Sequence, residues 1–206
     1  MNIFESKGVD FLAKINSFVE KEDLKLNDSL FKVLDQLHLK EGYHLGLKLA
    51  SENGLGDESW FYTYPIKNDD NIEFNTFEKD LNIFKNVMVE KTEMGAWQAY
   101  LLSASPSLLP LWWHSNYMRR TYFFDRDHFR GIILSFGDSI PINIDDIPQP
   151  SVNMCNNEAI VTCPYWNDWK GLVLESVRVA FKDDGKIKFD IVNSRALYKY
   201  DCGICF

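Results

Sequence analysis

Long apolar runs are missing from this sequence. The longest apolar cluster, Leu108 to Trp113, has six residues and contains Pro110, whereas a helix that crosses a membrane needs about 20 apolar residues. The segment from Met1 to Lys14 mixes lysine, glutamate and aspartate among its apolar residues, so it lacks the unbroken apolar stretch of a secretory signal. We therefore expect a cytoplasmic protein with neither a membrane span nor a membrane partner.

Cysteine is also scarce, and its four positions lie in the last quarter of the chain: Cys155, Cys163, Cys202 and Cys205. Without an export signal, reduced thiols are expected rather than disulfides. Cys202 and Cys205 form a CxxC, and with the other two cysteines they supply the four thiolates that a tetrahedral zinc site needs. Zinc sites usually take their ligands from closely spaced pairs, however, and seven residues separate Cys155 from Cys163. Only Phe206 follows Cys205, whereas a thioredoxin-like motif needs a following helix to lower the thiol pKa. We predict no metal and no cofactor, with these four thiols as the candidates if zinc binds.

Positive charge is in deficit, with 22 lysines and arginines against 30 acidic residues and a formal net charge of -8. A nucleic-acid backbone would meet a like-charged surface, so DNA and RNA are not expected partners. An acidic surface suits the capture of a basic protein, because complementary fields speed encounter. The sequence also lacks GxxxxGK[ST], GxGxxG after a strand, HExxH, GxSxG and an EF-type calcium loop, so no motif indicates a reaction class.

Apolar and aromatic residues, in contrast, are abundant. They make up 46% and 15% of the 206 residues, which is too apolar for a disordered chain. A chain of this length can bury one substantial core, so we expect a single domain over residues 1–206. The proline-rich stretch from Ser139 to Ser151 reads as a loop and is the only candidate for an internal boundary.

Apolar spacing in the first half predicts helices around one hairpin. A near 3.6-residue recurrence predicts a helix over residues 3–22, and Asn27 or Asp28 can cap a second helix that ends at Gly42. Alternation over Tyr43–Ala50 and the aromatic run Trp60–Ile66 predict a hairpin. Residues 77–91 fit a helix better than a strand at 87–89, and a further helix is expected from Met94 to Ser103.

The second half reads mainly as strands. A short strand is expected at Arg120–Asp125, with Asp125 capping a brief helical turn through His128 and Phe129. Three more strands are expected over residues 159–165, 172–181 and 186–192, and Ile187, Phe189 and Ile191 would share the buried face of the last. The predicted fold class is α+β, with N-terminal helices packed on one face of a mainly antiparallel sheet that ends in a C-terminal β-meander.

The placement of arginine is the most unusual feature. Four of the six arginines fall within twelve residues: Arg119, Arg120, Arg126 and Arg130. The first 100 residues contain lysine but no arginine. The rigid arginine fork suits bidentate contact with carboxylates or phosphates. Trp112, Trp113, His114 and Tyr117 stand just before it, and aromatics with arginine concentrate the energy of protein interfaces. The alternative is structural: Asp125 and Asp127 pair with the arginines, and the tryptophans are core.

Two functions remain open from these residues. The first is a non-enzymatic protein-binding module that uses the segment from Trp112 to Arg130, here called the arginine segment, to hold a protein partner. In general character, though through no motif, such a small acidic domain resembles the immunity proteins that neutralise toxins. The second is a small hydrolase or transferase in which His114, Tyr117, Arg119 and Arg120 act on an anionic substrate, with arginine stabilising the developing negative charge.

Overall fold

The computed structural model describes residues 2–21, 25–26, 29–50, 59–65, 83–109, 119–124, 126–135, 141–183 and 185–200. Its helices are α1 (Ile3–Lys21), α2 (Glu93–Ala104) and α3 (Arg126–Ser135), with short 3-10 helices at Ile83–Lys85, Ser105–Ser107 and Ile144–Asp146. Its strands are β1 (Lys25–Leu26), β2 (Leu37–Leu39), β3 (Tyr43–Lys48), β4 (Trp60–Pro65), β5 (Val87–Val89), β6 (Thr121–Tyr122), β7 (Ser151–Cys155), β8 (Glu158–Asn167), β9 (Gly171–Phe181) and β10 (Ile187–Tyr198). Among the described helices, none has the length and apolar character needed to cross a lipid bilayer.

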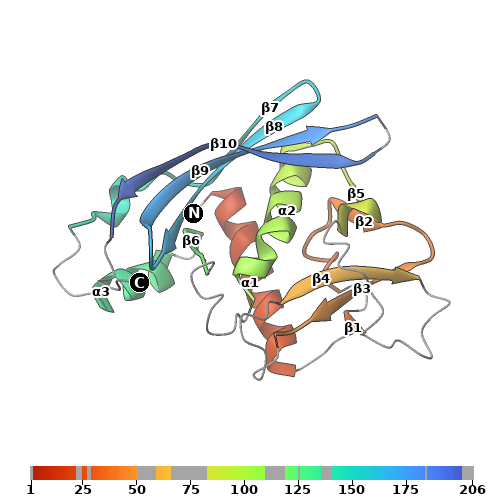
Figure 1. Ribbon diagram of the computed structural model, residues 1–206, viewed down its shortest axis with the longest axis horizontal. Helices are drawn as coiled ribbons and strands as arrows, with labels where there is room; N and C mark the ends of the chain where they lie inside the picture. The colour runs from red at the N-terminus through yellow and green to blue at the C-terminus, as the bar shows by residue number, and fades with distance from the viewer. Residues whose placement is uncertain are drawn as a thin grey trace.

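The largest sheet is antiparallel and lies over the helices, as Figure 1 shows. Its strand order is β10-β9-β8-β6. Strands β6 and β7 pair with the same edge of β8, β7 at the start of that strand and β6 near its end. Helix α2 packs against β7 and β8, and α1 packs against α2. The predicted α+β class, with helices from the first half of the chain on one face of an antiparallel sheet and a C-terminal meander, is therefore confirmed.

The two faces of this sheet are covered at different places. The inner face packs on α1 and α2, where Phe11, Ile15 and Trp97 are fully buried with Val161 and Val179 of the sheet. The outer face is covered at one end by α3, in a second cluster of buried residues: Phe123, Phe129, Ile133, Ile147, Trp166 and Leu172. Neighbouring residues of a strand point to opposite faces, which explains why Tyr165 belongs to the first cluster and Trp166 to the second.

The second predicted helix is wrong. Asn27 and Asp28 lie outside the described residues, while residues 29–36 form turns and residues 37–39 form β2. Strand β2 pairs with β5 through Leu37 opposite Val89, so residues predicted as helical on both segments form a small sheet. Gly42, with φ +83, turns the chain between β2 and β3.

The helix predicted over residues 77–91 is also wrong over its described part, residues 83–91. Residues 77–82 lie outside the described residues, and residues 83–91 contain a 3-10 turn followed by β5. The predicted hairpin is confirmed as β3 and β4, with Leu45 opposite Thr63, and the predicted helix at Met94–Ser103 is confirmed as α2.

Several boundaries in the second half differ from expectation. The brief turn predicted through His128 and Phe129 is the ten-residue helix α3, and its predicted cap Asp125 lies outside the described residues. Strand β7 begins at Ser151, where a loop was expected. Strand β10 continues to Tyr198, with a register shift between Ile191 and Asn193. Ile191 shares the inner face, since it pairs with the buried Val177, yet it is 63% exposed. The inner face of β10 is thus only partly buried.

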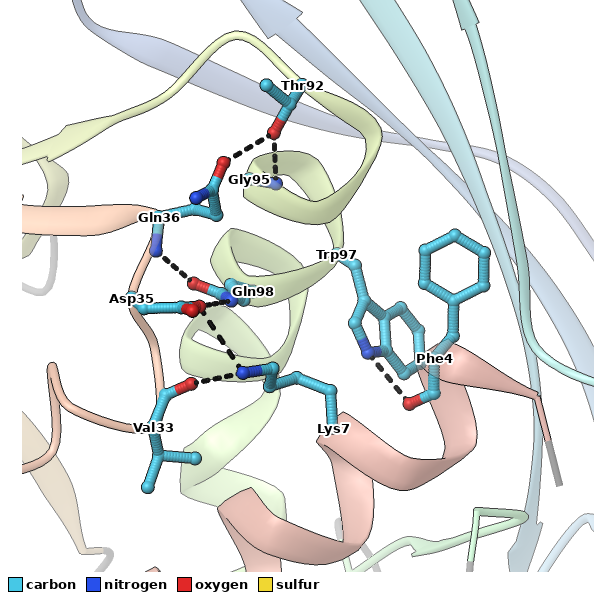
Figure 2. Close-up of polar contacts among 9 residues, drawn as sticks. All are labelled: Phe4, Lys7, Val33, Asp35, Gln36, Thr92, Gly95, Trp97 and Gln98. Carbon is cyan, nitrogen blue, oxygen red and sulfur yellow. Dashed lines mark hydrogen bonds and ion pairs between the residues drawn. The ribbon is translucent and has the colours of Figure 1, made fainter.

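A polar cluster around Gln98 explains why residues 33–36 turn instead of continuing a helix (Figure 2). Gln98 is fully buried on α2; its Oε1 accepts a hydrogen bond from the main-chain N–H of Gln36 at 2.7 Å, and its Nε2 donates to Asp35 Oδ1 at 2.6 Å. Lys7 of α1 donates to the same carboxylate and to the Val33 carbonyl. Side chains from two helices therefore satisfy main-chain and carboxylate groups of this turn.

Replacing Gln98 with leucine should lower the free energy of unfolding by about 2–3 kcal/mol, because the Gln36 amide and the Asp35 carboxylate lose their buried partner. Urea denaturation followed by circular dichroism measures this loss. The matched control is Gln149→Leu at an exposed position, expected to change stability by less than about 0.5 kcal/mol. Equal losses in the two variants would contradict the role given to Gln98.

The same cluster should be visible in the titration of Asp35. The hydrogen bond from Gln98, helped by Lys7, outweighs partial burial and holds the pKa of Asp35 below its ordinary value of 3.8. Because the folded pKa is the lower one, the stabilisation is present above the unfolded pKa and is lost as pH falls through the folded pKa. Carboxyl NMR titration should show the Asp35 pKa rising in Gln98→Leu; an unchanged pKa would refute this assignment.

Candidate functional site

A cavity lies between the inner face of β8–β10 and the C-terminal end of α2. Its volume is about 810 Å³, and it opens to solvent. Strand β4, the 3-10 turn at Ile83–Lys85, the end of α2 with Ser105–Ser107, and strands β6, β8, β9 and β10 all contribute to it. We call this cavity the groove. A volume near the upper end of ordinary ligand pockets makes it large enough for several side chains.

Most of the groove wall is apolar and aromatic. Trp60 and Phe61 of β4 form one side, and Phe84 and Phe189 form another, with ring centroids 5.1 Å apart. Ile191 of β10 continues this wall towards solvent. Aromatic side chains provide much contact area for little loss of side-chain entropy, so this wall can hold an apolar group.

The polar end of the groove is a single ion pair. Arg120 Nη1 lies 2.7 Å from Glu175 Oε1, and the two side chains are 27% and 3% exposed. The guanidinium stacks over the Tyr165 ring with its Cζ 4.4 Å from the centroid, and Nη1 also reaches Tyr122 Oη at 3.5 Å. The main-chain N–H of Arg120 donates to the Ser107 carbonyl. Arg120 is thus held in one orientation by β6, β8, β9 and the end of α2.

Among the described residues, Arg120 bonds through only part of its donor capacity. A guanidinium carries five N–H donors. Within the described part of the chain, its side-chain hydrogen bonds all come from Nη1. The N–H groups of Nε and Nη2 have no acceptor among the described residues, and Arg120 is a lining residue of the groove.

The titratable groups around this pair stay protonated at neutral pH. Burial raises the pKa of Tyr165 to about 12 and also raises the pKa of Tyr122. Burial raises the pKa of Tyr100 well above its ordinary value, and it does the same for the thiol of Cys163, which lies opposite Glu175 in the sheet. A thiolate or phenolate nucleophile is therefore not favoured at this end of the groove.

The four arginines of the arginine segment do not gather in one place. Arg120 lines the groove, whereas Arg126 reaches the buried Glu5 at 3.4 Å and the exposed Asp145 at 3.9 Å. The side chains of Arg119 and Arg130 are exposed. Trp112, Trp113, His114 and Tyr117 lie outside the described residues. The carboxylates that pair with Arg120 and Arg126 are distant in sequence, and partner binding by the arginine segment stays a prediction.

Glu175 is the site residue that sequence reasoning missed. It interrupts the apolar phase of β9, between Val173 and Val177, where the alternation places side chains on the inner face. A buried carboxylate needs a cation or several donors. An acidic residue at a buried position of a predicted strand therefore indicates a buried ion pair, and Glu175 carries this signal.

The two described cysteines are far apart. Cys155 is exposed and lies opposite Glu158 in the pairing of β7 with β8. Cys163 is buried five residues after Glu158 on β8, and five residues of a strand span roughly 16 Å. The two thiols therefore cannot ligate one zinc ion. Cys202 and Cys205 lie outside the described residues, and within the described ranges there is no cluster of three or more potential metal ligands.

Arg120→Met should lower the free energy of unfolding by about 2–4 kcal/mol, because it leaves the Glu175 carboxylate buried without its cation. The double variant Arg120→Met with Glu175→Gln should be more stable than Arg120→Met alone, and denaturation of all variants measures this coupling. Arg178→Met is the control, since Arg178 and its partner Glu158 are 41% and 52% exposed and such pairs contribute less than about 1 kcal/mol. Additive effects of the two groove substitutions would contradict the pair.

Comparison with known proteins gives no family assignment for this chain. No protein-family model matches it, and no curated protein or solved structure is significantly similar to it. The function is therefore argued from the groove itself, through the shape, charge and polar groups described above.

Proposed function

We propose that this protein is a non-enzymatic binding module that holds a segment of a partner protein in the groove. The observation that carries the proposal is an open, preformed cavity of about 810 Å³ whose walls are aromatic and whose polar end is lined by Arg120, which bonds through Nη1 alone among the described residues. Such a site can bury an apolar side chain and bond the polar group beside it. Buried apolar anchors next to arginine are typical of the energetic centres of protein interfaces.

A protein segment suits the groove better than a free small molecule because the groove continues onto the edge strand β10. Ile191 lines the groove and is 63% exposed, and the next residue, Val192, is 42% exposed at the register shift. Among the described strands, none pairs with the outer edge of the twelve-residue β10. An extended chain can pair along such an edge and place alternate side chains into a neighbouring pocket.

The charge of the chain indicates what kind of partner it attracts. A formal net charge of -8 favours encounter with a basic protein. The expected partner is a basic protein with an exposed apolar or aromatic segment, which agrees with the general resemblance to immunity proteins. The acidic surface would steer the approach, and the groove would provide the anchor.

The hydrolase or transferase alternative receives less support from the groove. Of the four residues it needs, Arg120 lines the groove, Arg119 is exposed and is not a lining residue, and His114 and Tyr117 lie outside the described residues. Histidine is missing from the described lining residues, and the pKa values of Tyr100, Tyr122 and Tyr165 are raised away from neutrality. A general base at neutral pH is therefore not provided by these groups.

Selection of a random peptide library on the purified protein should enrich peptides in which an aromatic or large aliphatic residue is flanked by basic residues. Synthetic copies should lose about tenfold or more in affinity for Ala104→Phe, whose ring would fill the groove at the end of α2. Isothermal titration calorimetry measures both affinities.

Ala13→Phe is the matched control, because Ala13 lies on an exposed face of α1 and receives the same substitution. It should bind the peptides as the unmodified protein does, and circular dichroism should show both variants folded. Failure to enrich any peptide, or equal binding by Ala104→Phe and Ala13→Phe, would overturn the proposed function.

A further inference from the structure

We infer that the polar end of the groove takes an uncharged peptide group from within a partner segment, and that it discriminates against a carboxylate such as a free C-terminus. This inference rests on the proposed function and specifies the chemistry of its ligand. It follows from the way Arg120 is already neutralised inside the protein.

The Arg120 guanidinium does not present a net positive charge to the groove. Its Nη1 is 2.7 Å from the carboxylate of Glu175, a residue of which 3% is exposed. A ligand carboxylate bound to the remaining donors would lie close to that buried carboxylate, and two like charges held side by side in a partly buried site repel each other. One guanidinium would then face two carboxylates, leaving a net negative charge at the polar end.

A peptide carbonyl avoids this repulsion and still gains a strong hydrogen bond. The acceptor is neutral, and the donor is a charged guanidinium, which makes a stronger bond than a neutral amide donor would. The Tyr165 ring and the main-chain bond to Ser107 already hold Arg120 in place. The unused N–H groups therefore need little rearrangement to meet a carbonyl oxygen.

The lysines that line the groove do not alter this preference at its polar end. Lys170 and Lys188 are exposed, and Lys188 Nζ is 2.8 Å from Asp190 Oδ1. Charges in water at the mouth act on an anion weakly and are screened by salt. Measurements at moderate salt therefore report on the buried pair rather than on these lysines.

Two fluorescent probes with the same aromatic body test the inference: dansyl-phenylalanine amide, which is neutral, and dansyl-phenylalanine, which carries a carboxylate. Fluorescence titration at roughly 0.3 M salt should show the amide binding the unmodified protein about fivefold or more tighter. In Glu175→Gln the guanidinium regains its net charge, so the preference should disappear or reverse. Lys170→Gln is the control and should keep the preference of the unmodified protein.

Each outcome separates this inference from the function on which it rests. If the unmodified protein binds the carboxylate probe as tightly as the amide or more tightly, the inference is wrong, while loss of both probes in Ala104→Phe would still support the groove. If neither probe binds, or if Ala104→Phe leaves both affinities unchanged, the groove is not the binding site and both proposals fail. Should Glu175→Gln not fold, the comparison of the two probes on the unmodified protein decides alone.

Discussion

The structure around the groove depends on one buried negative charge. Glu175 stands on the inner face of β9, where the neighbouring positions of the same phase are valines. A carboxylate at such a place is stable only with a cation beside it, and Arg120 supplies that cation from the start of β6. The bond from the Arg120 main chain to Ser107 then connects the end of α2 to the sheet. The polar end of the groove results from this single requirement.

Helix α2 carries a polar cluster around Gln98 on one side and ends beside the Arg120–Glu175 ion pair, and the two clusters differ in what they face. At Gln98, the side-chain oxygen and nitrogen are both bonded to the turn before β2 (Figure 2). At Arg120, within the described residues, the guanidinium bonds through Nη1 and faces a cavity. The Gln98 contacts join α2 to the turn before β2, whereas Arg120 lines an open groove and suits an external acceptor.

The spacing of apolar residues was sufficient to predict most of the helices and strands, but it did not predict which of them pack or pair together. The stripe of α1, the hairpin β3–β4, helix α2 and the C-terminal meander each repeat their own period within a short stretch. Leu30, Leu34 and Leu37 have helical spacing too, yet they lie in turns and a strand because Gln98 and β5 offer better partners from far along the chain. The candidate site was only partly predictable for the same reason. Arg120 stood out by its residue type, and Glu175 could have been noticed by its place in the buried phase of β9, but their ion pair forms only when β8 joins β9 to β6.

The distance along the chain between α1 and its partners also bears on synthesis. Trp97, which donates to the Phe4 carbonyl across 93 positions, leaves the ribosome long after the apolar stripe of Phe11 and Ile15. During translation that stripe is exposed until α2 follows, and surface of this kind attracts chaperones and promotes aggregation. The hairpins of β7 to β10 join neighbours in sequence and can form quickly once made. A nascent chain that stops before α2 therefore leaves the side chains of Phe11 and Ile15 without the helix that covers them in the folded protein.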